Sequence, residues 1–375
     1  MTARPTIGIV GLGTMGLGIA QVYAQAGLPV IATDAYAPAR DSAHDRLAEA
    51  LGSRVAAGKL TEADRDATLS RLIVAHDLSG LHPCKLVVEA IVEKLEAKQS
   101  LFAALEGIVR PETILATNTS SLPVGAIAGT LRHPARVLAL HFFNPPPAMK
   151  LVELAPHAGT SADAVTYAGE WTSAAGKTVV LCPDRPGFIV NRCARPYYGE
   201  ALALLAEGRS AGEIDAAMTV AGYKLGPFAL IDLIGADINL AATEGMYVAM
   251  GQHPRYLPFA ALKTQVGSGN LGRKTGRGFV FPGALAAPPP DAAAIALRIE
   301  ATLVNEAHWL LAEGGTTPDG IDTAMRLGLN FPRGPFQALA SHGRSTIRDE
   351  LGRLRAAAPA DLTRRYDLAP GLAKA

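Results

Sequence analysis

Short apolar runs alternate with longer amphipathic stretches from residue 6 to about residue 183. This alternation predicts a parallel β-sheet covered by helices, because strands buried on both faces appear as continuous apolar runs. The predicted strands are 6–10, 30–33, 86–90, 114–117, 137–141, 151–154 and 178–181. Residues 41–72 are instead charged and helical, which predicts a helical hairpin inserted into the sheet pattern. The hairpin either walls a ligand cleft or presents a solvated face.

Two proline- and glycine-containing breaks divide the rest of the chain. After the first, CPDRPG at 182–187, the strand pattern ends and helical periodicity dominates, which indicates a domain boundary near 184. The second, FPGALAAPPP at 281–290, has the composition of an extended linker. We therefore predict three domains, at 1–183, 184–283 and 284–375.

The helical part contains an internal repeat. The segments EALALLAEG, IDAAM and GPF begin at residues 200, 214 and 226, and related segments begin at 306, 321 and 334. The offset stays near a hundred residues, which indicates a duplicated helical unit rather than a chance of composition.

A glycine-rich turn, GLGTMG, follows the first predicted strand and opens a helix. Gly11 permits the tight turn, Gly13 lets the backbone approach a pyrophosphate, and Gly16 allows the helix to pack closely on the strand. An isolated glycine pattern would be an ordinary turn, but Asp34 ends the next strand, as a dinucleotide site requires. The helix dipole would then face the phosphates. The predicted fold is α/β, a Rossmann-type domain followed by an all-α region of two repeated units.

Asp34 also selects the cofactor. A carboxylate at this position accepts hydrogen bonds from a ribose hydroxyl and repels a 2′-phosphate. The sequence therefore predicts NAD rather than NADP.

A second constellation lies around a proline-rich turn. One apolar strand ends at His141, the turn contains residues 144–147, and a second apolar strand carries Glu153. A carboxylate in an apolar run needs a partner, and the returning strand can bring it beside the imidazole. Such a pair is typical of acid/base catalysis, in which the acid fixes the ring tautomer and the other ring nitrogen faces substrate. The alternative is a structural pair that closes the strand junction.

Two serines follow the strand 114–117. Ligands of open α/β sheets bind beyond the carboxyl ends of the strands, so Ser120 is predicted to donate a hydrogen bond there. One of Ser120 and Ser121 could instead only cap the helix that Pro123 starts. Neither serine lies in a nucleophile elbow, which argues against an attacking role.

Composition narrows the partners. The 375 residues are 49% hydrophobic and carry a net charge of +1, which favours a small-molecule ligand over nucleic acid or an anionic membrane. The three cysteines have no metal-ligand spacing, so we expect no metal site and a reducing, cytoplasmic setting. The N-terminal segment leads almost directly into a strand, and we expect neither a signal peptide nor a membrane span.

Seven ordered motifs resemble those of the 3-hydroxyacyl-CoA dehydrogenase family. They are the GxGxMG turn at 11–16, VVEAIVE at 87–93 with Lys98 following, NTSSL at 118–122, HFFNP at 141–145, LVE at 151–153, PGFIVNR at 186–192 and GRKTGRGF at 272–279. The resemblance covers nearly the whole chain.

The resemblance implies a role for each matching residue. His141 would be the catalytic base and Glu153 its partner, while Ser120 and Asn191 would hold the substrate oxygen and the thioester region. The NAD site would comprise the three glycines of the turn together with Met15, Asp34, Glu93, Lys98 and Asn144. NAD-dependent interconversion of (3S)-3-hydroxyacyl-CoA and 3-oxoacyl-CoA, as in fatty-acid β-oxidation, is the expected activity. His141 would take the C3 hydroxyl proton as hydride leaves C3 for C4 of the nicotinamide.

Two other functions are weighed against this one. The GLGTMG turn also resembles that of dehydrogenases of free hydroxy acids and sugar acids, but the β-hydroxyacid enzymes among them use a lysine in place of a His and Glu pair. A non-catalytic structural relative would require a lost site, and all the assigned residues are present. Acyl length stays open, with short straight, longer and dicarboxylic groups all compatible with the sequence.

The duplicated unit is similar to that of the longer family members and of multifunctional fatty-acid oxidation enzymes. Leu297 occupies the position at which the repeat offset places the counterpart of Asn191, so only the first copy is equipped to face substrate. The second copy is expected to occupy the packing surface that a neighbouring subunit covers in single-copy relatives. The chain is then either a monomer or a homodimer.

Overall fold

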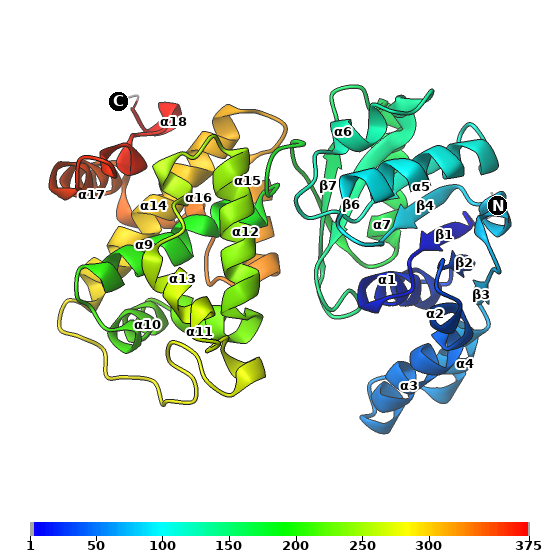
Figure 1. Cartoon of the computed structure of the whole chain (residues 1–375), viewed down its shortest axis with the longest axis horizontal. Helices are drawn as coiled ribbons and strands as arrows, with labels where there is room; N and C mark the ends of the chain where they lie inside the picture. The colour runs from blue at the N-terminus through cyan, green and yellow to red at the C-terminus, as the bar shows by residue number, and fades with distance from the viewer. Residues whose placement is uncertain (1–3, 374–375) are drawn as a thin grey trace. The chain divides into compact units, whose positions relative to one another are not determined.

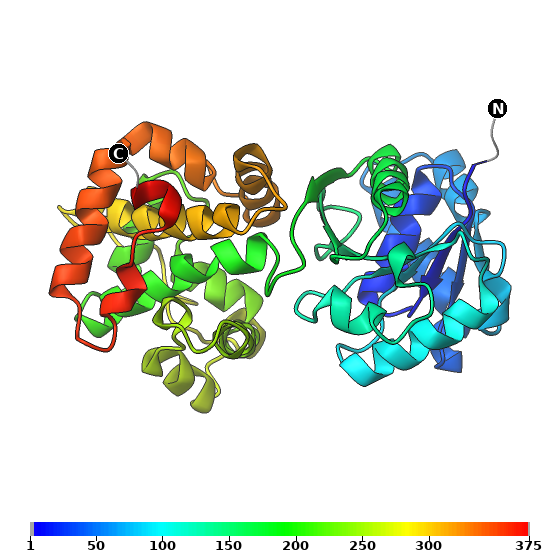
Figure 2. The same ribbon diagram turned by 90° about the horizontal axis from the view of Figure 1, so that it is seen from above.

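The computed structural model describes residues 4–373, which divide at Arg185 and Pro186 into two compact units (Figure 1). The first unit contains an eight-stranded sheet with helices on both faces, and the second is helical (Figure 2). The predicted fold class, an α/β domain followed by a helical region, is confirmed. The finer division at residue 284 stays a prediction.

The first unit is built from short strands and mostly longer helices. Its strands are β1 (Ile7–Val10), β2 (Val30–Thr33), β3 (Leu72–Val74), β4 (Leu86–Glu89), β5 (Ile114–Thr117), β6 (Val137–Phe142), β7 (Leu151–Pro156) and β8 (Thr178–Leu181). Its helices are α1 (Thr14–Gln25), α2 (Ala37–Asp41), α3 (Ala43–Ala56), α4 (Glu62–Leu69), α5 (Leu95–Ile108), α6 (Val124–Ala128) and α7 (Ala162–Ala174). All seven predicted strands are present, and α3 and α4 form the predicted hairpin.

The strand order is β3-β2-β1-β4-β5-β6-β7-β8, and two features of this sheet differ from the prediction. The strand β3 was missed, because three apolar residues after a charged helix are too short to show a period. The sheet is also not wholly parallel, since β7 runs antiparallel to β6. The segment between them is too short for the crossover that a parallel neighbour needs.

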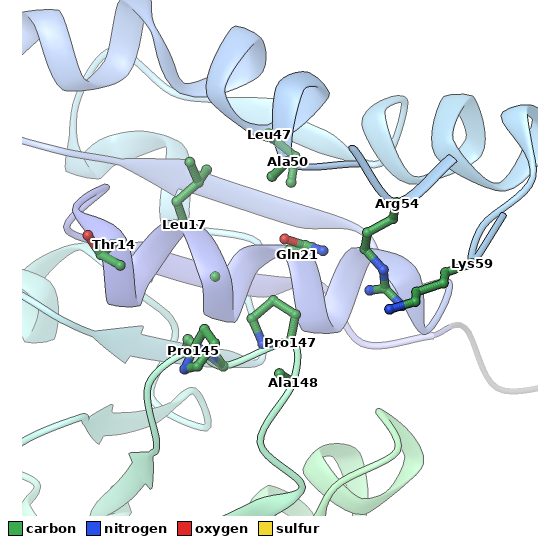
Figure 3. Close-up of a pocket in the computed structure, with 12 residues that line it drawn as sticks. Thr14, Leu17, Gln21, Leu47, Ala50, Arg54, Lys59, Pro145, Pro147 and Ala148 are labelled. Carbon is green, nitrogen blue, oxygen red and sulfur yellow. The ribbon is translucent and has the colours of Figure 1, made fainter. Parts of the chain in front are cut away.

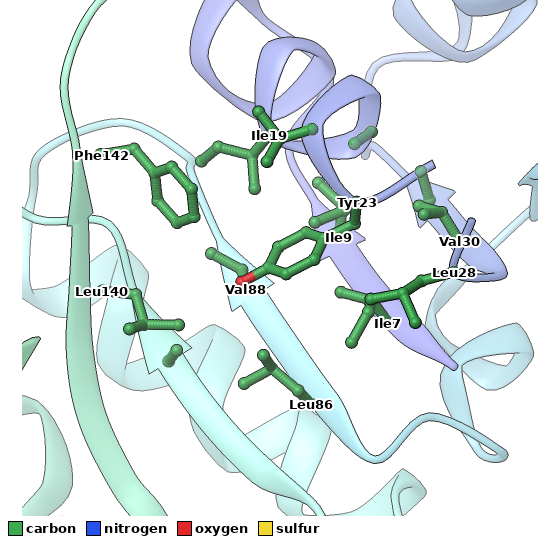
Figure 4. Packing of buried hydrophobic residues seen from close by; sticks show 14 of the residues in the cluster. Ile7, Ile9, Ile19, Tyr23, Leu28, Val30, Leu86, Val88, Leu140 and Phe142 are labelled. Atoms are coloured by element: carbon green, nitrogen blue, oxygen red, sulfur yellow. The ribbon is translucent and has the colours of Figure 1, made fainter. Parts of the chain in front are cut away.

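A large hydrophobic cluster of the first unit lies between the sheet and the helices α1, α3 and α7. Figure 4 shows alternate residues of neighbouring strands, such as Ile7, Val88 and Leu140, pointing toward Ile19 and Tyr23 of α1. The Tyr23 hydroxyl lies 2.8 Å from Thr172 Oγ1 of α7, and burial raises the pKa of this tyrosine. The buried polar tip is thereby satisfied, as a core tyrosine requires.

The second unit consists of helices that fall into two series. The first series is α8 (Val190–Cys193), α9 (Arg195–Ala206), α10 (Ala211–Val220), α11 (Pro227–Ile234), α12 (Ala236–Ala249) and α13 (Ala260–Gly267). The second series is α14 (Ala292–Ala312), α15 (Pro318–Leu329), α16 (Pro335–His342), α17 (Arg344–Ala357) and α18 (Pro370–Ala373). None of the helices described between residues 4 and 373 has the length and apolar character needed to cross a membrane.

Equivalent aspartates show that the repeat is structural. Asp215 Oδ1 and Oδ2 accept hydrogen bonds from the backbone N–H groups of Phe228 and Ala229, at the start of α11. Asp322 makes the same two bonds at the start of α16. Each carboxylate thus satisfies helix N–H groups that have no partner within the helix.

The two repeats exchange buried ion pairs. Arg192 Nε of the first repeat lies 2.7 Å from Glu306 Oε1 of the second, and Arg298 Nε of the second lies 2.7 Å from Glu200 Oε1 of the first. Both glutamates are fully buried. Burial alone would raise the pKa of Glu200, but Arg365 and Arg298 outweigh it and hold that pKa below its usual value. Each repeat therefore contributes buried charges to the interface between them that are neutralised by residues of the other repeat.

Candidate active site

The glycine turn has the geometry of a phosphate cradle. Gly11 has φ +96°, and a Cβ at this residue would lie 2.6 Å from the carbonyl oxygen of Ala90. A Cβ on Gly16 would lie 1.7 Å from the carbonyl oxygen of Gly11. Both positions therefore require glycine. No described atom lies within 4 Å of a Cβ built on Gly13, which leaves room for a ligand.

Asp34 is fixed beside this turn. Its Oδ2 accepts a hydrogen bond of 2.6 Å from Leu12 N, and its Oδ1 accepts one of 2.8 Å from Tyr36 N. A cavity of about 750 Å³ adjoins it, lined among others by Gly11, Gly13 and Asp34. The start of α1 carries no acidic residue in its first turn, so the positive end of its dipole is not neutralised locally. These residues fit a dinucleotide.

The remaining residues predicted for the NAD site are more scattered. Met15 is half-buried and packs against the sheet core, and Asn144 is exposed at the end of β6. Lys98 is only 1% exposed, and its Nζ lies 2.6 Å from Glu89 Oε1 and 3.3 Å from Glu93 Oε2. Lys98 therefore stands behind Glu93 rather than on an open surface.

Glu93 organises the turn that carries the two serines. Its Oε1 accepts hydrogen bonds from Thr119 Oγ1 at 2.6 Å, Ser120 N at 3.0 Å and Ser121 Oγ at 3.1 Å. Burial favours the neutral acid, but the bond from Thr119 and the charge of Lys98 outweigh it and keep the pKa of Glu93 below its usual value. The side chain thus joins β4 to the turn after β5.

His141 and Glu153 form the predicted pair. They face each other in the register of β6 and β7, and His141 Nδ1 lies 2.7 Å from Glu153 Oε2. Glu153 is fully buried and His141 is 7% exposed. The antiparallel turn of the chain explains the contact, because residues directly opposite on antiparallel strands bring their side chains together.

Asn118 connects the turn that carries the two serines to β6, the strand of His141. The sequence did not predict this role. Asn118 Oδ1 accepts a hydrogen bond of 2.8 Å from Phe142 N, the residue after His141. Asn118 belongs to the NTSSL motif, but the sequence does not reveal that its side chain bonds to a backbone N–H 24 residues away.

The loop between His141 and Glu153 is also anchored. Lys177 Nζ donates to the carbonyl oxygens of Pro146 at 2.6 Å and Met149 at 2.8 Å. A Cβ on Gly18 of α1 would lie 2.9 Å from Pro146 Cδ, so the loop packs directly on that helix. Burial lowers the pKa of Lys177, whose role the sequence did not suggest.

This proline loop lines a second cavity, of about 550 Å³. Figure 3 shows α1, with Leu17 and Gln21, between the hairpin residues Leu47 and Ala50 on one side and the proline loop on the other. Arg54 and Lys59 line the cavity as well, and Figure 3 shows both toward the same end of it. The helical hairpin therefore walls a cleft, which was one of its two predicted roles.

Asn191 lies in the second unit, in α8, and its carbonyl oxygen accepts a hydrogen bond of 3.0 Å from Arg195 Nε. Its counterpart Leu297 packs instead against a buried cluster that includes Ile347 and Leu351 of α17. In the second repeat a helix thus covers the position that Asn191 holds in the first.

The GRKTGRGF motif forms a turn around one carboxylate. Asp232 accepts hydrogen bonds from the backbone N–H groups of Phe279, Val280 and Phe281, and Lys274 pairs with Asp237. Across residues 4–373, no group of three or more histidine, cysteine, aspartate or glutamate side chains is arranged to hold a metal ion.

Comparison with known proteins matches both units. The model of the 3-hydroxyacyl-CoA dehydrogenase NAD-binding domain matches residues 6–185, and that of the C-terminal domain of the same family matches residues 187–281 and 295–375. The crystal structure of 3-hydroxybutyryl-CoA dehydrogenase from Escherichia coli K12 superposes with a TM-score of 0.91 at 34% identity, over 99% of this chain and 98% of that one.

Two curated relatives agree with these matches. The 3-hydroxyadipyl-CoA dehydrogenase of Escherichia coli (strain K12) is 46% identical over 275 residues, which are 73% of this chain and 58% of that protein's length. The probable 3-hydroxybutyryl-CoA dehydrogenase of Deinococcus radiodurans is 40% identical over 274 residues, 72% of this chain and 98% of that one. The chain therefore belongs to the 3-hydroxyacyl-CoA dehydrogenase family and is an NAD-dependent enzyme that interconverts 3-hydroxyacyl-CoA and 3-oxoacyl-CoA.

Proposed function

We propose that His141 exchanges the proton of the C3 oxygen and that Glu153 holds its ring for this step. The observation that carries the proposal is the contact of 2.7 Å between Nδ1 and Glu153 Oε2. With Nδ1 engaged by the carboxylate, Nε2 is the nitrogen that would meet the substrate oxygen. Glu153 would stabilise the imidazolium formed when (3S)-3-hydroxyacyl-CoA is oxidised. Bound NAD supplies the hydride acceptor, and the chain supplies orientation and the proton path.

We assign supporting roles to the other predicted residues. Ser120, fixed through its backbone N–H to Glu93, would donate a hydrogen bond to the C3 oxygen, and Asn191 would hold the thioester region. The glycine turn, Met15 and Asn144 would contact NAD, with Asp34 on the adenosine ribose. Lys98, because it is buried, would act by holding Glu93 rather than by touching the cofactor.

The cavity beside the proline loop is proposed to receive part of the acyl-CoA. Its two cations, Arg54 and Lys59, suit the phosphate groups of coenzyme A, since guanidinium and ammonium groups are the usual partners of phosphate. Relatives named for 3-hydroxybutyryl-CoA and for 3-hydroxyadipyl-CoA make a short straight acyl group and a dicarboxylic one the two substrate candidates.

A cytoplasmic role in fatty-acid or related acyl-CoA breakdown fits these features. The three cysteines are free and buried, which suits a reducing compartment. A small acyl-CoA as ligand, without nucleic acid or membrane, agrees with the near-neutral charge of the chain.

For the oligomeric state we propose that the second repeat takes the place of a second subunit. The reciprocal pairs Arg192–Glu306 and Arg298–Glu200 support this, because an exchange of equivalent residues is what a two-fold interface between identical subunits produces. A monomer is then expected, with a homodimer through another surface as the alternative. Light scattering across a range of concentrations distinguishes the two.

Steady-state assays test the substrate proposal. We expect the purified chain to oxidise NADH with acetoacetyl-CoA and to leave free 3-hydroxy acids unused in the presence of NAD. A series of straight and dicarboxylic acyl-CoA substrates then ranks kcat/KM by acyl group. Turnover of the free acids at a rate equal to that of the thioesters would contradict the proposal.

A further inference from the structure

The rim of the cavity beside the glycine turn carries opposite charges close together. Asp34 lines this cavity, and so does Arg40, six residues later in the short helix α2. The helix folds back so that Arg40 Nη1 lies 2.5 Å from the carbonyl oxygen of Asp34 and 3.3 Å from that of Ala35. The guanidinium is therefore held at the backbone of the same residue whose side chain selects the cofactor.

Within the described residues, the guanidinium of Arg40 contacts carbonyl oxygens and not a carboxylate. In residues 4–373 its hydrogen bonds go to these two backbone carbonyls, and no ion pair joins it to a carboxylate of that range. A buried or half-buried guanidinium in a protein is usually paired with an acid. Here two carbonyl oxygens orient one of its nitrogens and leave its charge available to an anion.

The other ionisable groups lining the cavity do not change this balance. Asp77 is turned toward Ser79, whose backbone N–H and hydroxyl both donate to its Oδ1. His76 lies beside Asp77, at 3.7 Å, and is largely exposed. Asp34 and Arg40 are thus the two opposite charges fixed at the point where the ribose of a bound dinucleotide meets the end of β2.

We propose that Arg40 is the second half of a cofactor selector. Asp34 accepts hydrogen bonds from the ribose hydroxyls of NAD and repels a 2′-phosphate. Arg40 is placed to bind that phosphate once the carboxylate of Asp34 is removed. The choice between NAD and NADP then depends on the carboxylate of Asp34, because the arginine that would bind the 2′-phosphate of NADP is already in position. The inference rests on the proposed position of the adenosine ribose at Asp34, and it goes beyond it by assigning Arg40.

The chemistry follows from charge and hydrogen-bonding capacity. A 2′-phosphate carries close to two negative charges and three acceptor oxygens, and a guanidinium offers a planar set of donors that matches it. Asp34 is already oriented by Leu12 N and Tyr36 N, so its charge cannot turn away from the phosphate without breaking both bonds. In the wild-type protein the repulsion from Asp34 therefore dominates.

Direct binding of NADH and NADPH to the full-length protein tests the inference, followed by nucleotide fluorescence so that no thioester turnover is needed. We expect Asp34→Ser to weaken NADH binding by about 10-fold and to tighten NADPH binding by at least about 10-fold. Adding Arg40→Ala to this variant should remove the gain in NADPH affinity while changing NADH binding far less. The NADPH gain should also fall as salt increases.

A matched control is available in Arg46. Its Nη2 also donates to two backbone carbonyls of this region, those of Leu12 and Ala39, but Arg46 does not line the cavity. The Asp34→Ser, Arg46→Ala variant should keep its NADPH affinity. Asp34→Asn, which retains an acceptor for Leu12 N, serves as a second variant if the serine substitution lowers the melting temperature.

The outcomes separate the inference from the assignments beneath it. If the wild-type protein binds no NADH, the cofactor site itself is misassigned. If NADH binds but neither substitution of Asp34 increases NADPH affinity, the selector is refuted. If the gain appears and survives the loss of Arg40, another residue binds the phosphate and the role of Arg40 is refuted.

Discussion

Within residues 4–373, two buried glutamates each contact a histidine, one in each unit. In the first unit, His141 Nδ1 lies 2.7 Å from Glu153, and in the second, His342 Nε2 lies 2.6 Å from Glu300. Both glutamates are fully buried. By distance and by burial of the acid, the two pairs are equivalent.

Their surroundings are different. Glu300 also accepts hydrogen bonds from Arg333 and from the Tyr223 hydroxyl, at 2.9 and 3.0 Å, so it joins α14 to two other segments of the helical unit. His141 is the penultimate residue of β6, in the sheet that carries the glycine turn, on the edge where ligands of this fold bind. The comparison teaches that a His and Glu contact is not itself a catalytic signature. Its position in the fold decides whether the pair does chemistry or holds helices together.

The largest effect is expected on kcat, and it should follow from a substitution in the His141–Glu153 pair and not from one in the His342–Glu300 pair. His141→Gln should lower kcat by about 1,000-fold, because it removes the group that we propose exchanges the proton, while NADH binding stays measurable. Steady-state kinetics with acetoacetyl-CoA and a separate NADH titration check the two parts. A kcat within threefold of wild type would place the chemistry elsewhere.

Glu300→Gln should act on stability rather than on rate. The substitution leaves Arg333 and His342 facing a neutral side chain, and breaking a buried ion network costs on the order of 3 kcal/mol of unfolding free energy. Urea denaturation measures the loss. We expect kcat of the folded variant to stay within twofold of wild type. A large loss of kcat without loss of stability would contradict the structural role of this pair.

Glu153→Gln is expected to lower kcat by roughly 10- to 100-fold, less than the loss of the histidine itself. The amide still accepts a hydrogen bond from Nδ1 but no longer stabilises the imidazolium by charge. The pH profile of kcat should shift relative to wild type, which a purely structural role would not cause. An unchanged profile together with an unchanged kcat would argue against the pairing.

The smallest effect is expected for His342→Gln, the matched control for the first substitution. His342 is partly exposed, with 26% of its side chain accessible, and Glu300 keeps its bonds to Arg333 and Tyr223. The cost should stay below about 1 kcal/mol of unfolding free energy, with kcat unchanged. If the two histidine substitutions lowered kcat equally, the contrast between the pairs would be lost.

The sequence predicted the first of these pairs but not the second. His141 ends the predicted strand 137–141 and Glu153 lies in the next one, 151–154, so a tight turn was enough to bring them together. Glu300 and His342 lie on different helices, 42 residues apart, and their contact depends on how those helices pack. The role of Lys177 was not predicted either, because its partners are backbone carbonyl oxygens, which leave no pattern in the sequence of side chains.

Among the elements of the fold, length decided what could be predicted. The strands of four or more residues were predicted, whereas the three residues of β3, at the end of the charged insert, were not predicted as a strand. Apolar runs report burial and not the direction of the chain, so the pattern predicted a parallel sheet; the proline-rich turn before Glu153 was the feature that indicated a returning strand at β7. The place of Lys98 in the NAD site, which the family resemblance implies, stays a prediction; the structure shows that its side chain is 1% exposed and pairs with Glu89 and Glu93.

The ion pairs that Arg192 and Arg298 form between the two repeats affect how the helical unit responds to dilution of the protein. Arg192 and Arg298 each find their acids on the same polypeptide, across a connection that begins after α13 and ends at α14. The local concentration of each partner is thus set by the length of that tether and not by the amount of enzyme in the cell. A chain with one repeat would have to meet another molecule to neutralise its buried charges, and its folded fraction would fall at low copy number. Fusion of the repeats makes this helical unit insensitive to how scarce the protein becomes.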